Sequence, residues 1–215
     1  MTTAIDPALT LHQWLSPAFP VGAFAYSHGM ESEVAAGRLP DAAAVLSWLD
    51  ICLTQGSGRN DAILLAAAHR GAADLPRDLA DLAEALAPSA ERREETMAQG
   101  RAFATTINAL HGLDLSPMAY PLVVGQAAGR MQLPLGLTLR LFLQAFAGNL
   151  VSAAVRLVPL GQTDGQKVLA ALAPVIENLA IEAKSGDLDA IGGAALTIDL
   201  ASMRHERQRT RLFRS

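Results

Sequence analysis

The chain has 215 residues and a formal net charge of −4; 51% of its residues are hydrophobic and only 18% are charged. This composition excludes a largely disordered chain and suits one well-buried domain, in which roughly 70% of the unfolded surface is buried. Cys52 is the single cysteine, which excludes a disulfide framework within one chain, and the first residues lack the pattern of a secretory signal, so we expect a cytoplasmic protein.

Alanine and leucine dominate, aromatic residues make up 5% and runs of β-branched residues are scarce, which favours helices over strands. Proline, glycine and capping residues divide the chain into helical segments. The expected helices cover residues 9–15, 23–36, 42–55, 61–69, 76–87, 90–110, 117–131, 135–158, 166–183 and 187–203. The sequence therefore predicts an all-α fold with a single compact domain of about ten helices.

Several of these helices carry start signals. Asp41 is placed to cap the helix that follows it, and Ser116 is placed to cap the helix that runs to Met131. Pro117 suits a first helical turn, because the N–H group that proline lacks would have no partner within the helix there. The prolines of Ser16–Gly22 predict an irregular loop there.

The segment Leu135–Val158 is the expected centre of the domain. Between Arg140 and Arg156 it contains no charge, and its apolar residues face every side. A helix that is apolar all round is either buried in a globular protein or crosses a membrane. The uncharged stretch is 15 residues long, whereas a membrane span needs roughly 20. The sequence favours a buried central helix and no membrane span; a surface helix that forms a dimer is the alternative.

The last 12 residues, Arg204–Ser215, form a basic tail, and residues 1–203 form the helical domain. The tail holds five arginines and one glutamate, whereas the rest of the chain carries 12 basic and 20 acidic side chains. This asymmetry predicts that the tail contacts something acidic. The apolar pair Leu212-Phe213 favours a tail that docks into a groove of a partner protein and becomes ordered on binding. Nucleic acid is the weaker alternative because the tail has a single aromatic residue, and a solvated, frayed terminus is another.

Patterns that indicate catalysis or metal binding are scarce. No two of the five histidines have the spacing of three or four that puts two metal ligands on one helical face, and neither a GxSxG nor a GxxxxGK motif occurs. Cys52 lies among apolar neighbours, which predicts core packing rather than reactivity. We therefore expect no enzyme activity, no cofactor and no metal site within one chain. His28 could contribute to a site shared across a symmetric dimer, but the sequence favours a hydrogen-bonded structural residue there.

Two polar stretches need separate interpretation. The run Glu91–Glu95 is typical of a solvated helix start, where carboxylates complement the helix dipole; a binding surface is the alternative. Tyr26, His28 and Glu31 lie in a stretch that is unusually polar for an alanine-rich chain. Composition leaves open whether this stretch is a catalytic pocket, an interface or a packed corner.

Four ordered segments resemble the motifs of the urease accessory protein UreF family. They read SPAFPVGAFAYSHGMESEV, REETMAQG, NLVSAAVRLVPLGQTDGQ and SMRHERQRTRLFRS. The resemblance spans about Leu11 to Ser215. One departure is Arg209, where the family often has an aromatic residue, so a stacking contact is in doubt there.

The resemblance implies an all-helical, non-enzymatic chaperone or adaptor that works as a homodimer. Such proteins assist GTP-dependent nickel insertion into apo-urease, bridge a UreD/UreH-type scaffold protein and a UreG-type GTPase, and modulate GTP hydrolysis. Neither nucleic acid nor a membrane is an expected partner. The alternatives are a small-molecule enzyme that uses the N-terminal Tyr/His/Glu motif, and nucleic-acid binding through the Arg-rich tail.

Carried over by position, the resemblance also implies site residues. The tail residues expected to bind the scaffold partner are Arg204, His205, Glu206, Arg207, Arg211, Leu212, Phe213, Arg214 and Ser215. Tyr26, His28 and Glu31 are expected at an interface or an internal passage. Asn149, Ser152 and Arg156 are expected on the central helix, where structural hydrogen bonding is an equally good interpretation.

Overall fold

The computed structural model describes residues 6–215, which form ten α-helices, two short 3-10 helices and no strand. The predicted all-α fold is confirmed. In chain order the elements are α1 (Pro7–Leu15), η1 (Ala23–Ala25), α2 (Met30–Ala35), α3 (Ala42–Thr54), α4 (Ser57–Arg70), α5 (Arg77–Ala85), α6 (Ala90–His111), α7 (Tyr120–Arg130), α8 (Leu135–Leu157), α9 (Gln162–Ala183), η2 (Leu188–Ala190) and α10 (Leu196–His205).

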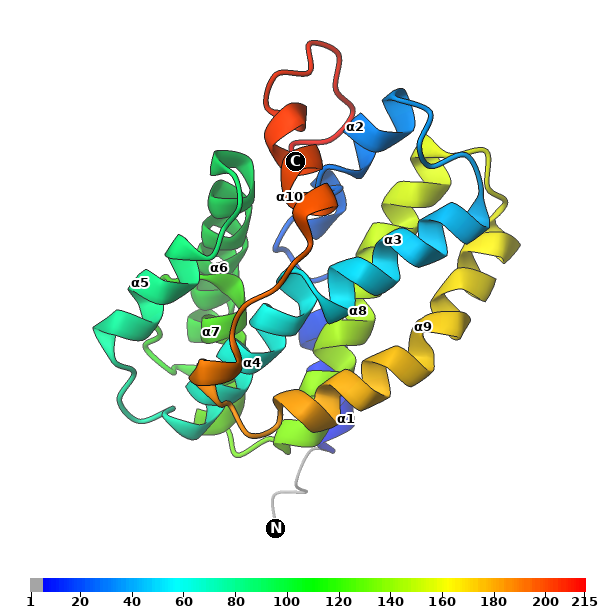
Figure 1. The fold of residues 1–215 in the computed structure, drawn as a ribbon. Helices are drawn as coiled ribbons and strands as arrows, with labels where there is room; N and C mark the ends of the chain where they lie inside the picture. The colour runs from blue at the N-terminus through cyan, green and yellow to red at the C-terminus, as the bar shows by residue number, and fades with distance from the viewer. Residues whose placement is uncertain (1–5) are drawn as a thin grey trace.

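Helix α8 runs through the middle of the molecule and contacts α1, α2, α3, α4, α7, α9 and η1 (Figure 1). Leu139, Leu143, Ala147 and Ala154 are fully buried along it, as the prediction of a central helix requires. By length and composition alone α8 could cross a membrane, but half of its most apolar stretch is buried inside the protein. The core helix of a soluble protein passes the same test, so this finding does not indicate a membrane span.

Helices α4 and α7 form a close pair because glycines line their contact. A Cβ atom at Gly125 would lie 2.3 Å from the carbonyl oxygen of Leu65, and one at Gly129 would lie 2.4 Å from that of His69. The two backbones therefore approach more closely than larger residues would allow. Helix α6 contacts α7, and α5 packs against the pair through a small apolar cluster that includes Leu79 and Ala83. These two helices lie on one side of the molecule, while α3, α8 and α9 lie on the other (Figure 1).

The cap predicted at Asp41 is confirmed, since its carboxylate accepts the N–H of Ala44 at 2.9 Å. The start predicted at Ser116-Pro117 is wrong: α7 begins only at Tyr120. The preceding residues run in a non-helical connection that Asn108 fixes, because its amide nitrogen donates to the carbonyl oxygen of Leu115 and its amide oxygen accepts the Leu115 N–H.

Two other expected helices are interrupted. Residues 23–36 were expected as one helix, but the chain forms η1, leaves helical geometry at Tyr26–Gly29 and resumes as α2. Residues 187–203 form η2, a connection and α10, and α10 continues into the tail as far as His205. Helix α10 packs against α2 and α6 at the end of the molecule opposite the start of α1 (Figure 1).

Candidate functional site

The interruption at Tyr26–Gly29 creates the surface that receives the tail. Both His28 (φ 54°) and Gly29 (φ 78°) adopt the left-handed conformation, which is costly for most residues. A Cβ atom at Gly29 would lie only 2.5 Å from the backbone nitrogen of Ser202, so α10 crosses the loop directly over this glycine. The loop therefore turns its polar groups toward α10 and the residues that follow it.

Glu31, at the start of α2, is the main anchor for the tail. Its carboxylate accepts the backbone N–H groups of Leu212 at 2.7 Å and Phe213 at 2.9 Å. The Nε2 atom of His205 lies 3.3 Å from the same carboxylate. Hydrogen bonds to a carboxylate are stronger than hydrogen bonds between neutral groups. Glu31 thus fixes the tail through its main chain.

His205 lies fully buried between two carboxylates. Its Nδ1 atom is 2.7 Å from Oε2 of Glu91, while Nε2 faces Glu31, and Arg211 pairs with the other oxygen of Glu91. Both ring nitrogens of His205 therefore face a carboxylate, one from α2 and one from α6. The tail is therefore tied to both α2 and α6 through charged groups.

The end of the tail pairs with the loop before α2. The N–H of Arg214 donates to the carbonyl oxygen of Ala25, and the N–H of Ser27 donates to the main-chain oxygen of Ser215, both at 2.8 Å. The Phe213 ring is buried, and the guanidinium of Arg156 on α8 lies 4.5 Å from its centroid. Backbone pairing, a buried ring and charged anchors together hold the tail on the body.

A buried charged cluster lies beneath the tail. The hydroxyl of Ser215 donates to Glu95 at 2.7 Å, and Glu95 also pairs with Arg92 and lies 3.0 Å from Nε2 of His28. Burial opposes the charge on Glu95, but Arg92 and His28 outweigh that effect and lower its pKa to about 2. Burial, and then the Arg92 charge, lower the pKa of His28. Glu95 is thus held as a carboxylate and His28 is favoured in its neutral form.

The contacts of His28 leave one of its nitrogens without a partner. Its Nε2 lies 2.6 Å from a guanidinium nitrogen of Arg92 as well as near Glu95. A neutral ring nitrogen cannot both accept from Arg92 and donate to Glu95, so only one of these contacts is a hydrogen bond. The buried Nδ1 atom has no partner anywhere in residues 6–215.

The structure divides the tail residues expected to bind a partner into two groups. His205, Phe213 and Ser215 are buried against the body. The exposed group consists of Arg204, Glu206, Arg207, Arg211, Leu212 and Arg214. The apolar pair Leu212-Phe213 is thus split, because Phe213 faces inward and Leu212 faces solvent. Ordering on partner binding stays a prediction.

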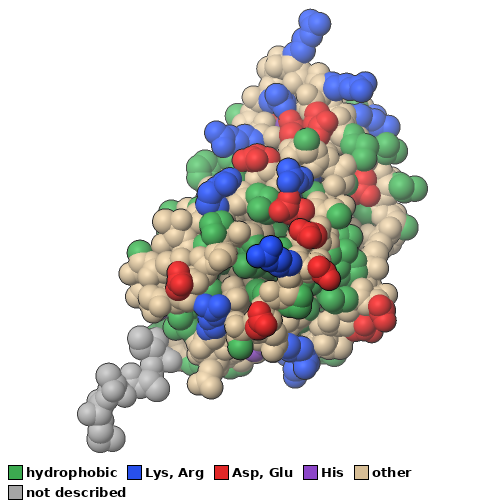
Figure 2. All heavy atoms as spheres, turned by 90° about the vertical axis from the view of Figure 1, so that its left-hand side faces the viewer, with side chains coloured by type: hydrophobic (Ala, Val, Ile, Leu, Met, Phe, Trp, Pro, Cys, Tyr) green, Lys and Arg blue, Asp and Glu red, His purple; other side chains and the backbone are tan. Residues whose placement is uncertain are grey.

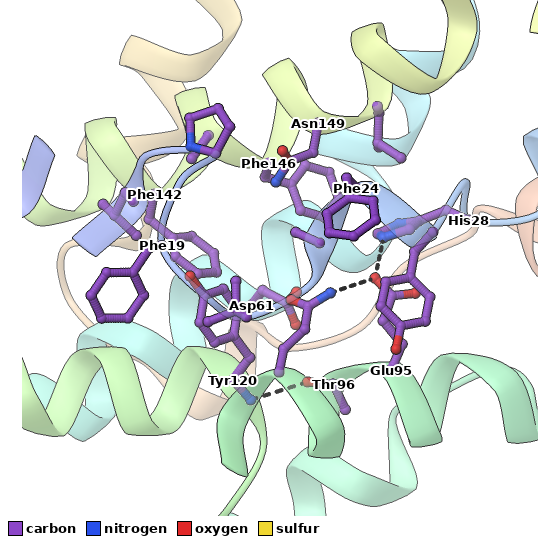
Figure 3. A pocket seen from close by; sticks show the side chains of 18 of the residues that line it. Phe19, Phe24, His28, Asp61, Glu95, Thr96, Tyr120, Phe142, Phe146 and Asn149 are labelled. Carbon is purple, nitrogen blue, oxygen red and sulfur yellow. Dashed lines mark hydrogen bonds and ion pairs between the residues drawn. The ribbon is translucent and has the colours of Figure 1, made fainter. Parts of the chain in front are cut away.

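Tyr26, His28 and Glu31 are all buried in the single chain, but they do not lie in the same place. Glu31 faces the tail. Tyr26 and His28 line a small cavity of about 70 Å³, together with Asp61, Asn149 and several aromatic side chains (Figure 3). The structure therefore brings two of the three candidates to one internal space.

Of the other two candidates on α8, Ser152 is exposed, and Arg156 donates to the carbonyl oxygen of Phe24 at 3.2 Å. Among residues 6–215, no group of three or more His, Cys, Asp or Glu side chains could hold a metal ion.

Comparison with known proteins decides the family, because the UreF family profile matches residues 39–173, more than half of the chain. The chain belongs to the UreF family. It is 58% identical over 207 residues to the urease accessory protein UreF of Cereibacter sphaeroides strain KD131, which covers 96% of this chain and 98% of that protein. It is 50% identical over 213 residues to the urease accessory protein UreF of Roseobacter denitrificans, which covers 98% and 95% respectively.

The sequence interpretation missed the charged cluster of this UreF chain. The run Glu91–Glu95 was expected to be solvated, which is wrong for Arg92 and Glu95, whose exposed fractions are 7% and 3%. A signal was present: Arg92 and Glu95 continue, at steps of three and four, the buried stripe that includes Phe103 and Ile107. Asp61 gave no comparable signal, because only the folded chain encloses it.

Proposed function

We propose that this UreF-family chain is an accessory protein of urease maturation that acts as an adaptor and not as an enzyme. The observation that carries the proposal is the similarity, over nearly the whole chain, to proteins named urease accessory protein UreF. In this proposal the chain works in the cytoplasm as a homodimer. It bridges a UreD/UreH-type scaffold protein and a UreG-type GTPase, and it modulates GTP hydrolysis during nickel insertion into apo-urease.

Helix α10 supports an adaptor role because it exposes an apolar face. Leu196, Leu200 and Met203 follow one another at steps of four and three and are all exposed, and Leu212 of the tail is exposed as well. An apolar stripe on a helix that ends in a basic tail is typical of a protein-binding surface. We assign this stripe, Leu196, Leu200 and Met203, to the contact with the scaffold protein.

The exposed arginines of the tail give the partner's expected chemistry. Arg207, Arg209 and Arg214 are exposed, and the backbone N–H of Arg214 donates to the body at Ala25. A tail held in place loses less conformational entropy on binding than a free one. In this proposal the scaffold protein offers acidic groups to these arginines and an apolar groove to the stripe.

Two observations weigh against the alternative functions. The carboxylate oxygens of Glu31 both accept hydrogen bonds from the tail, so this group is not free to act as a base toward a substrate. Arg204 and Arg211 pair with Glu33 and Glu91, which removes part of the basic charge that nucleic-acid binding would need.

The decisive experiment compares two leucine variants in co-purification with the scaffold protein. Leu200→Glu places a charge in the apolar stripe, whereas Leu110→Glu places the same charge at the end of α6; the two leucines are 46% and 51% exposed. We expect Leu200→Glu to lower the retained scaffold protein at least tenfold and Leu110→Glu to leave it unchanged. The helical signal of both variants must match that of the unmodified chain.

Point variants are preferable to removal of the tail, because His205, Phe213 and Ser215 are part of the packed body. Equal retention by both variants would move the interface away from α10. The adaptor proposal itself fails if the unmodified chain retains no scaffold protein and if its loss leaves urease activation in cells unchanged.

A further inference from the structure

A second, larger cavity lies beside the aromatic one. Its volume is about 300 Å³, at the lower end of the range of roughly 300–1,000 Å³ for small-molecule pockets. His28, Asp61, Arg92 and Thr96 line both cavities and so form their common wall. The exposed glycines 192 and 193 also line the larger one and place one of its sides at the surface.

The walls of the larger cavity carry polar groups that the protein leaves without partners. Within residues 6–215, the buried Nδ1 atom of His28 has no hydrogen-bond partner. The half-buried Asp61 and Asp199 line the same cavity and form no ion pair with a described side chain. A buried ring nitrogen without a partner costs free energy, and half-buried carboxylates without a counter-charge leave their charge to the solvent or to a ligand. A ligand that pairs with these groups would account for their lack of protein partners.

The charge balance indicates the sign of this ligand. Arg92 is the cationic side chain of the lining, and it is already paired with Glu95. Burial raises the pKa of Asp61 to about 7, although the charge of Arg92 opposes the shift, and burial also raises the pKa of Asp199. Both carboxylates therefore lack sufficient positive charge nearby.

We propose that the larger cavity binds a small organic cation, an alkylammonium or guanidinium compound, whose charge is paired by Asp61 and Asp199. A metal ion is disfavoured, because no group of three metal-ligating side chains occurs in residues 6–215. Leu64, Leu86 and Ile198 supply apolar walls for an alkyl chain. This inference does not rest on the proposed function.

The smaller cavity strengthens the choice of an organic cation. Figure 3 shows Asp61 facing this cavity among the aromatic side chains of Tyr120, Phe142 and Phe146. Aromatic faces attract weakly hydrated organic cations through the negative charge of the ring face. These rings line the smaller cavity and not the larger one, so a cation would contact them only where it reaches past Asp61.

Isothermal titration calorimetry on the unmodified full chain tests the proposal. The probe is 1,4-diaminobutane, which has two ammonium groups for two carboxylates, and 1,4-butanediol is the neutral control of the same length. We expect saturable binding of the diamine with one molecule per chain and none of the diol. No saturable binding at millimolar diamine, or equal binding of the diol, would overturn the proposal.

Variants locate the binding site. Asp61→Asn should weaken diamine binding at least tenfold and Asp199→Asn should weaken it less, because Asp61 is shared by both cavities. Asp78→Asn, which removes an exposed charge on α5, should leave binding unchanged. If Asp61→Asn binds like the unmodified chain, the cavity is not the site. In the unmodified chain, the NMR signals of the His28 ring should shift as the diamine is added. This measurement needs no substitution, so it does not depend on whether a variant folds.

Two further arms separate the natural sources of the cation. A blocked tripeptide, acetyl-Gly-Arg-Gly-amide, competes with the diamine if the natural ligand is an arginine side chain of a partner. If the tripeptide does not compete while agmatine does, the natural ligand is a free small molecule. Displacement of the diamine by an equimolar amount of Ni²⁺ would make this a metal site and would contradict the proposal.

Discussion

The contacts of Glu31 lead to a direct prediction about the tail. Glu31→Gln keeps the size of the side chain but replaces one carboxylate oxygen with a donor, which then faces the N–H of Leu212 or Phe213. A hydrogen bond to a charged group contributes roughly 1.5–3 kcal/mol. Because tenfold in an equilibrium constant corresponds to about 1.4 kcal/mol, anchoring of the tail should weaken roughly ten- to hundredfold.

Amide hydrogen exchange measures this change at the two amides themselves. We expect the amide protons of Leu212 and Phe213 to exchange roughly ten to a hundred times faster in Glu31→Gln, while the core amides of α8 change little. Glu182→Gln, an exposed position on α9, is the matched control and should have no effect. Unchanged exchange at Leu212 and Phe213 would refute the argument that Glu31 holds the tail.

Two other predictions concern the loop and the cluster under the tail. Gly29→Ala should lower the free energy of unfolding by about 2–5 kcal/mol, because it combines left-handed strain with a clash against Ser202. Gly37→Ala has the same strain in open space and should cost only about 1–2 kcal/mol. Thermal unfolding of the two variants measures the difference, and equal losses would contradict the prediction. Glu95 has a pKa of about 2 in the folded chain and 4.5 as the ordinary value, so its stabilisation is fully present above about pH 4.5 and is lost as the pH falls toward 2. Glu95→Gln should therefore flatten the dependence of stability on pH in this window. It should also cost about 3–5 kcal/mol at pH 7, because Arg92 loses its partner. Urea denaturation from pH 2 to 7 measures both effects, and an unaltered slope would show that Glu95 is not the titrating group.

The parts of the fold that follow from local sequence were predictable. Asp41 caps α3 because a side-chain oxygen three residues before a free N–H suffices, whatever the rest of the chain does. The central position of α8 follows from a helix that is apolar on all sides. Both inferences depend on residues that are neighbours along the chain.

The failures have a common physical origin in contacts between distant residues. Ser116-Pro117 has the sequence of a helix start, but Asn108 holds the backbone of Leu115, and the Met118 carbonyl occupies the space that a side chain at position 100 would need. Likewise, His28 takes a left-handed conformation in a loop that α10 and the tail cover. The spacing of residues along the chain does not indicate which distant residues will come into contact.

The tail shows how an anchored segment changes the expectation for partner binding. The basic composition of Arg204–Ser215 predicted ordering on contact with the scaffold protein. In the single chain His205 and Phe213 are already buried, and Leu212 and Arg214 face solvent. If the partner binds this anchored form, less conformational entropy is lost on binding, because contacts with the body have already ordered the tail.

The Glu31→Gln variant then distinguishes two mechanisms of assembly. A partner that binds the anchored tail has an apparent dissociation constant equal to the intrinsic value divided by the anchored fraction. Releasing the tail should therefore weaken binding, by at most the ten- to hundredfold loss of anchoring expected above. A partner that binds the released tail requires the bonds to Glu31 to break first, so the Glu31→Gln chain would bind that partner more tightly. We expect weaker binding, because the buried anchors leave Arg207, Leu212 and Arg214 exposed for contact. Tighter binding would show that the tail has to leave the body before the scaffold protein can engage it.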